Sequence, residues 1–241
     1  MQVTFRAQVA LSCTGRLCIL VALVCLTLFG LQTPALAPVT TESWTDSDAT
    51  KTPRNDNWSD SNNWSSGVVP NGSNYSADIP LLGFPFTSPT QDISITLENL
   101  TVEPGTKDVV ADGVSLTLTG QSLVGGLLLN SAGKQTALNI NNTVTYTSTA
   151  SGNCCLLMMN KSLINGSGTL INQGTIGYGE SVAGNIGTIS GLTLQNHGTL
   201  YSGQNSTLKL APNSNWTNPG TIQSANPQFG CLPGQIKHRW D

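Results

Sequence analysis

Side chains that could catalyse the cleavage of a polysaccharide are sparse in this sequence of 241 residues. Such chemistry uses grouped carboxylates, often with a basic residue or a calcium ion beside them. Between Gly113 and Trp240 the only carboxylate side chain is that of Glu180, while Asp108 and Asp112 lie earlier in the chain. The sequence therefore predicts a protein without a catalytic site, and a polysaccharide lyase or hydrolase is the minority interpretation.

No other familiar catalytic or metal-binding pattern is present in the sequence. The two histidines, His197 and His238, are far apart, and no Ser/His/Asp arrangement, phosphate loop or Cys/His zinc spacing occurs. The 13 acidic and 10 basic residues leave no basic stripe that would favour nucleic acid. We therefore expect no nucleic-acid partner.

Four aspartates in the first quarter of the chain could supply hard oxygen ligands to Ca²⁺. They are Asp46, Asp48, Asp56 and Asp60. Their spacing matches neither an EF-hand loop nor a Gly-Gly-x-Gly-x-Asp repeat, and clustered Asp and Asn also form turns with their own backbone. We expect no cofactor, with Ca²⁺ as the alternative.

One short phrase occurs three times in the second half of the chain. It reads apolar-x-Asn-x-Gly-Thr followed by Ile or Leu, and it begins at Leu170, Leu194 and Trp216. Its fixed polar positions are Asn172 and Gly174, Asn196 and Gly198, and Asn218 and Gly220. The asparagines are 24 and 22 residues apart, a period typical of a stacked solenoid.

The phrase also predicts how successive coils stack. Residues two apart on a strand face the same way, so the apolar residue, the Asn and the Gly of one phrase share a face. Stacking would place Asn172, Asn196 and Asn218 above one another at about 4.8 Å, where their amides could form a hydrogen-bonded ladder. Each glycine would permit a positive φ or a close backbone approach.

Residues 91–225 read as successive short strands. Residues 93–97, 114–118 and 144–146 alternate apolar and polar, and Gly, Asn and Pro bound these runs. A β-sandwich would not repeat one phrase at this interval, and a propeller blade needs about 40–45 residues. We predict an all-β, right-handed parallel β-helix of five or six coils, followed by an irregular tail over residues 226–241.

Residues 38–90 precede this region and are rich in Trp and Asn. They contain the pattern Asn-Trp-Ser-x-x-x-Asn-Trp-x-x-Gly-x-x-Pro, which starts at Asn57 and is preceded by Trp44. The stretch 44–79 resembles the start of many bacterial secreted β-helical proteins, including the passenger domains of autotransporters and adhesins. The resemblance implies that the tryptophans cap the open end of the β-helix.

A second interpretation of the tryptophans is that they bind sugars, because flat aromatic rings can stack on a pyranose. The candidate ligand-binding residues are Trp44, Trp58, Trp64 and Trp216.

Residues 1–37 have the features of an export signal. Arg6 and Arg16 supply positive charge, residues 17–31 are apolar, and Ala35-x-Ala37 has the form of a cleavage site. The apolar run is short for a membrane span, which needs about 20 residues, so we expect cleavage and no stable membrane span afterwards. A retained anchor is the alternative.

Removal of the signal would leave three of the six cysteines, Cys154, Cys155 and Cys231. Three cysteines do not make a disulfide framework. One bridge to Cys231 and burial as small hydrophobic residues are both compatible with the sequence.

Together these features predict a secreted or cell-surface protein. We expect a structural or adhesive module whose partners are polysaccharides or other cell-surface components. The alternatives are a carbohydrate-binding module that uses the tryptophans, a lyase or hydrolase that uses Glu180, and a fragment of a longer passenger protein.

Overall fold

The computed structural model describes residues 38–47, 55–82, 89–106, 108–147, 156–158, 161–177, 186–202 and 207–224. The chain divides into two units, residues 1–38 and 39–241, and the description below concerns the second. The predicted signal, Asp48, Glu180, and the three cysteines left after its removal lie outside the described residues. No helix in the described ranges combines the length and hydrophobicity that a membrane span requires.

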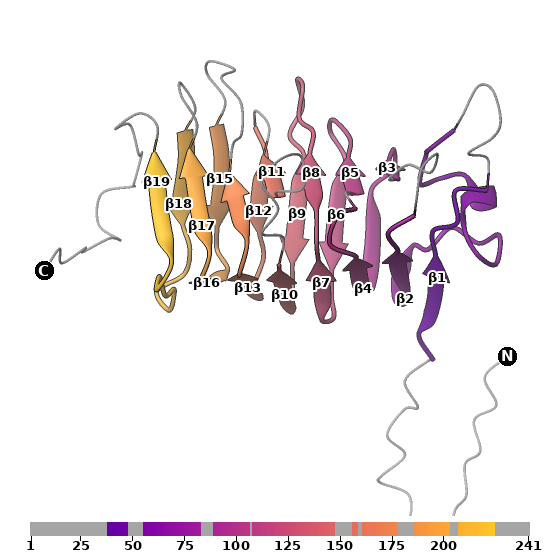
Figure 1. Ribbon diagram of the computed structural model, residues 1–241, viewed down its shortest axis with the longest axis horizontal. Coiled ribbons are helices and arrows are strands. Elements are labelled where there is room, and N and C mark those ends of the chain that lie inside the picture. The colour runs from indigo at the N-terminus through magenta and orange to yellow at the C-terminus, as the bar shows by residue number, and fades with distance from the viewer. Residues whose placement is uncertain are drawn as a thin grey trace, which may run out of the picture. The chain divides into compact units, whose positions relative to one another are not determined.

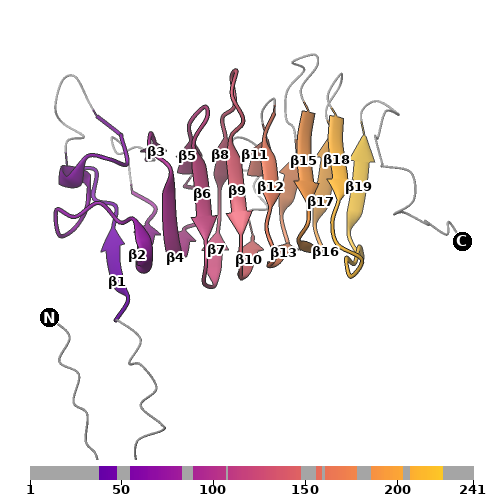
Figure 2. The ribbon, with the colours of Figure 1, turned by 180° about the vertical axis from the view of Figure 1, so that it is seen from behind.

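In the described part of the second unit, short parallel strands follow one another along one axis from β1 to β19 (Figures 1 and 2). The predicted parallel β-helix is confirmed, with about five turns. The strands belong to a 12-stranded and a 7-stranded sheet, which together supply three faces of the solenoid. One coil contributes one strand to each face in turn.

The first two faces belong to the larger sheet. The first face contains β6 (Ser115–Leu118), β9 (Ala137–Ile140), β12 (Leu163–Asn165), β15 (Ile186–Ser190) and β18 (Thr207–Ala211). The second face contains β7 (Ser122–Val124), β10 (Thr143–Tyr146), β13 (Thr169–Asn172) and β16 (Thr193–Asn196).

The smaller sheet forms the third face. Its strands are β3 (Thr90–Gln91), β5 (Asp108–Val110), β8 (Leu127–Leu129), β11 (Leu156–Met158), β14 (Thr175–Gly177), β17 (Thr199–Ser202) and β19 (Thr221–Ser224).

The long strand β4 (Ile95–Val102) turns the corner between the first two faces, because its first residues pair with β6 and its last residues pair with β7. β2 (Gly72–Ile79) pairs with β4, and β1 (Thr40–Ser43) pairs with the second half of β2. The sheet therefore extends into residues 38–90, which we expected to form an entry and capping segment. The start of β2 was not recognisable because its first residues, Gly-Ser-Asn, show no apolar alternation.

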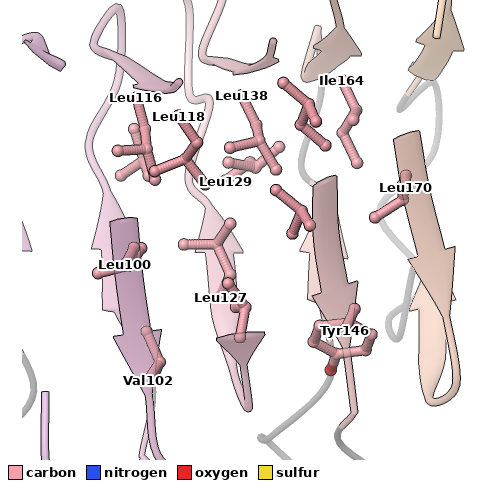
Figure 3. Packing of buried hydrophobic residues seen from close by; sticks show 14 of the residues in the cluster. Leu100, Val102, Leu116, Leu118, Leu127, Leu129, Leu138, Tyr146, Ile164 and Leu170 are labelled. Carbon is pink, nitrogen blue, oxygen red and sulfur yellow. The ribbon is translucent and has the colours of Figure 1, made fainter. Parts of the chain in front are cut away.

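Leucine, isoleucine and valine at alternate strand positions point inward and stack from coil to coil (Figure 3). Leu116 lies in register with Leu138, and Leu138 lies in register with Ile164; all three are fully buried. Burial of each such side chain stabilises the fold by about 1.5–3 kcal/mol. Apolar side chains of this kind thus fill most of the interior.

The corner between the second and third faces requires glycine. A Cβ atom on Gly198 would lie 2.0 Å from the backbone oxygen of Gly174, and one on Gly220 would lie 2.2 Å from that of Gly198. Real side chains do not approach this closely, so only glycine lets these corners stack at the spacing of adjacent strands.

Candidate functional site

Trp44, Trp58 and Trp64 form a buried cluster at the N-terminal end of the β-helix. The ring centroids of Trp58 and Trp64 are 4.4 Å apart, and those of Trp44 and Trp64 are 5.3 Å apart, in edge-to-face arrangements that aromatic rings favour. The Nε1 of Trp64 donates to the backbone oxygen of Trp58 at 2.8 Å, and the Nε1 of Trp58 donates to that of Pro70 at 3.1 Å. The cluster covers the first coils of the core.

These three rings are no more than 3% exposed. The prediction that they are stacking platforms for sugars is therefore wrong, because a buried ring has no free face to offer. Their burial agrees instead with the capping interpretation. Trp216 is half-buried against the core in the last coil, far along the chain from the other three.

Both carboxylate oxygens of Asp60 accept hydrogen bonds from neighbouring residues of the chain. Its Oδ1 accepts from the backbone amide of Asn62 at 3.0 Å and caps the 3₁₀ turn η1 (Ser61–Asn63), while its Oδ2 accepts from Nδ2 of Asn55 at 2.8 Å. Asp46 is fully buried and Asp56 is half-buried. Among the residues that the structure describes, no three His, Cys, Asp or Glu side chains gather where they could hold a metal ion.

Asp108 faces the interior of the β-helix and not a surface groove. It is fully buried on β5 and accepts a hydrogen bond from Nε2 of Gln91 on the neighbouring β3. Burial raises the pKa of the Asp108 carboxyl to about 7, although hydrogen bonds from Gln91 and from the Val109 amide act in the opposite direction. A carboxyl group enclosed in this way cannot reach a polysaccharide bound outside.

Asp112 connects two successive loops. Its Oδ1 accepts from the backbone amides of Ala132, Gly133 and Lys134 at 2.8–3.0 Å. The hydrogen bonds from Gly133 and Lys134 lower the pKa of the Asp112 carboxyl most. The carboxylate therefore holds adjacent coils together. His197 is exposed at the corner after β16, as its variable place in the repeated phrase indicates.

The predicted asparagine ladder is present in the interior. The Nδ2 of Asn172 donates to Oδ1 of Asn196 at 2.6 Å, and the Nδ2 of Asn196 donates to Oδ1 of Asn218 at 2.6 Å. The Oδ1 of Asn172 accepts from the backbone amide of Gly174 at 3.1 Å. Asn172 and Asn196 are fully buried, so this ladder stabilises the corner and does not contact a ligand.

The outer side of the second face is hollowed, and two adjoining hollows of about 480 and 460 Å³ lie along it. Thr101 and Gln121 line both hollows, which makes them one continuous feature. The first is completed by Thr41, Ser76, Ala77, Asp78 and Asn99. The second is completed by Ser122, Leu123, Thr143, Thr145, Thr147 and Gln173. We call this surface the polar groove.

Strand register explains why hydroxyl and amide groups collect in the polar groove. Asp78, Thr101, Leu123 and Thr145 are aligned from β2 to β10, each on the strand next to the previous one. Thr41, Ser76 and Asn99 form a parallel row two positions earlier on β1, β2 and β4. Residues two apart on a strand share a face, so both rows project outward and form the floor of the groove.

Asp78 is the one residue with a titratable side chain among those that line the polar groove. Partial burial raises the pKa of the Asp78 carboxyl, and the nearby charge of Glu103 raises it further. The rest of the lining carries hydroxyls, carboxamides, one leucine and one alanine. This arrangement can exchange many neutral hydrogen bonds, and it offers no pair of acids for hydrolysis.

The other two faces differ from the groove face in character. Glu98 of β4 and Lys209 of β18 place charges among the outward residues of the first face. On the third face, Val109, Leu128 and Tyr201 occupy outward, half-buried positions. Uncharged polar groups line the two hollows described above, which lie on the second face.

No protein-family model, curated protein or solved structure matches the chain. The geometry of the polar groove therefore carries the functional interpretation.

None of the groove-lining residues was predicted from the sequence to bind a ligand. Their only sequence signal is alternation, as in Thr143-Val144-Thr145-Tyr146-Thr147, which occurs on every face of a β-helix. The positions of the corners decide which threonines align, and those corners can be assigned only once the strand pairing is known.

Proposed function

We propose that this chain is an exported adhesive module that binds a cell-surface or extracellular partner through the second face of its β-helix. The observation that carries the proposal is the polar groove, whose two hollows share Thr101 and Gln121 and together extend across β1, β2, β4, β7 and β10. A long row of uncharged donors and acceptors on a rigid scaffold suits attachment, because many modest contacts can add along an extended partner.

Export is supported by the signal-like residues 1–37 and by the pattern over residues 44–79 that resembles secreted β-helical proteins. The polar, weakly charged exterior fits the same location. The catalytic alternative has less support, because Asp108 is enclosed and Asp112 is bound to backbone amides.

To test the proposal, the full chain is expressed in a bacterial host, and its export and its adhesion to cells are measured separately. Mass spectrometry of the cell fractions should find the chain outside the cytoplasm, shortened at Ala35 or Ala37. Beads coated with the exported chain should be retained on bacterial or host-cell surfaces more than albumin-coated beads. Retention equal to albumin would contradict the adhesive function, and an uncleaved cytoplasmic chain would contradict export.

A further inference from the structure

We infer that the polar groove binds a neutral polysaccharide chain laid along the axis of the β-helix. This inference rests on the proposed adhesive function and assigns both the ligand class and its orientation. It depends on the chemistry of the lining, on the geometry of the two hollows, and on the contrast between the second face and the other two.

The lining is complementary to sugar hydroxyls. Thr101, Thr145 and Gln121 each present side-chain polar atoms that make no hydrogen bond to the described part of the protein. A hydroxyl can donate and accept, and a carboxamide can do both at separate atoms. The hydroxyls of a polyol ligand could both donate hydrogen bonds to these groups and accept hydrogen bonds from them. A ligand that has only acceptors could not do both.

Charge excludes the ionic classes of glycan. No Lys, Arg or His lines either hollow, so nothing there would neutralise the carboxylates of an acidic polysaccharide. Asp78 would repel such a chain whenever it is ionised. A single carboxylate at one end of the groove is also too little for a polycation. A neutral polysaccharide is therefore the class of glycan that suits the lining of the groove.

The shape favours an extended ligand that runs across the strands. Thr101 and Gln121 join the hollows, so the groove crosses β1, β2, β4, β7 and β10 in succession. Adjacent strands lie about 4.8 Å apart, and a pyranose unit has a similar length. Successive sugars could therefore meet equivalent positions on successive coils.

A protein partner fits this surface less well. The backbone groups of β2, β4, β7 and β10 on the groove floor are already paired on both sides within the sheet, as in the register of Thr101 with Leu123, so an added strand has no free ladder over them. Protein interfaces bury an apolar or aromatic centre, whereas Leu123, 43% exposed, is the large apolar side chain of the groove. One aliphatic side chain suits the apolar face of a sugar.

The test is affinity electrophoresis of the purified chain in gels that contain one polysaccharide each. The neutral probes are dextran, yeast mannan and xyloglucan, and the charged probes are alginate and chitosan. The groove variant is Thr101→Arg with Thr145→Arg. The matched control is Thr96→Arg with Thr188→Arg, which places the same two side chains on outward, half-buried positions of the first face.

We expect at least one neutral polysaccharide to retard the wild-type chain and the control equally, and the groove variant to bind about tenfold more weakly. Circular dichroism should show that all three are folded. If the arginine pair unfolds the chain, Thr101→Ala with Thr145→Ala replaces it and should weaken binding several-fold, since only hydroxyls are lost.

Retardation by alginate or chitosan alone, or undiminished binding by the groove variant, would overturn the inference. If no polysaccharide retards the chain while coated beads still adhere to cells, the ligand class is wrong and the adhesive function stands. If the beads also fail to adhere, both proposals fail together.

Discussion

The side-chain amide of Asn172 donates to Oδ1 of Asn196 at 2.6 Å, although these residues are 24 positions apart in the chain. They lie in register on adjacent strands, and Asn196 passes the same interaction to Asn218. Asn196 therefore occupies the middle of a buried ladder, with a partner on each side. This relationship predicts that the three asparagines do not contribute equally to stability.

Replacement of Asn196 by alanine should lower the free energy of unfolding by about 2–4 kcal/mol, because it removes a fully buried side chain together with its hydrogen bonds to Asn172 and Asn218. Replacement of Asn218 should cost about 1 kcal/mol, since it ends the ladder and is only half-buried. Urea denaturation followed by circular dichroism measures both. Gln195→Ala, on the outward side of the same strand, is the control and should change little. Equal losses of stability for the alanine variants of Asn196, Asn218 and Gln195 would contradict the ladder.

Glycine at the repeated corner should be irreplaceable by even one methyl group. Gly198→Ala would force a carbon into the backbone oxygen of Gly174, and we expect a loss of about 1–3 kcal/mol or a failure to fold. Gly133→Ala is the matched control, because its added carbon meets nothing closer than 3.8 Å. Thermal melting of the two variants checks the difference, and similar melting temperatures would show that the corner relaxes easily.

Asp108 should make the fold less stable as pH rises. Its pKa in the folded chain is about 7, above the ordinary value of 3.8, so the unfolded chain releases this proton first. The contribution of the protonated group is complete below pH 3.8 and is lost between that value and about 7. The slope approaches about 1.4 kcal/mol per pH unit within this window.

Asp108→Asn removes the ionisable group and should abolish the decrease in the free energy of unfolding that Asp108 causes as pH rises. We expect the variant to gain stability over the wild type as pH increases from 4 to 7, and to keep a constant advantage above pH 7. Urea midpoints at several pH values measure the difference between the two proteins. A difference that does not vary with pH would show that Asp108 is ionised in the folded chain.

The tryptophan cap should matter for stability and not for ligand binding. Trp64→Ala removes the ring that contacts both Trp44 and Trp58, and we expect a loss of about 3–5 kcal/mol. Trp216→Ala should cost less, since that ring is only half-buried. Addition of a polysaccharide that the chain binds should leave the emission of the buried cluster unchanged, which fluorescence of a variant with both Trp216→Phe and Trp240→Phe can test. A large spectral change would indicate that the tryptophan cluster takes part in binding the polysaccharide.

The repeated phrase was sufficient to predict the fold and the ladder, because Asn and Gly at fixed offsets constrain a stacked corner. It did not reveal that Val102, Val124 and Tyr146 fill the same inward column in the earlier coils. Valine and tyrosine at that position resemble the inward residues of any strand, so the corner carries no sequence signal until asparagine appears.

The candidate site was harder to predict for a different physical reason. The sequence does not show whether a tryptophan ring is buried or exposed. It therefore favoured the tryptophans as binding residues over the threonines that line the polar groove. Asp108 posed a similar problem, since a carboxylate near Lys107 and Asp112 reads as part of a polar loop, whereas the alternation of β5 directs it inward. Both distinctions depend on strand pairing between coils.

A scan of the three faces by bead adhesion tests whether the chain binds cells through the polar groove. Single variants would carry one arginine each on the first face (Thr188→Arg), the second face (Thr145→Arg) and the third face (Gln223→Arg). We predict that retention on target cells falls about tenfold for Thr145→Arg and stays at the wild-type level for the other two. Full adhesion by Thr145→Arg, or its loss through either of the other substitutions, would contradict the assignment of binding to the polar groove.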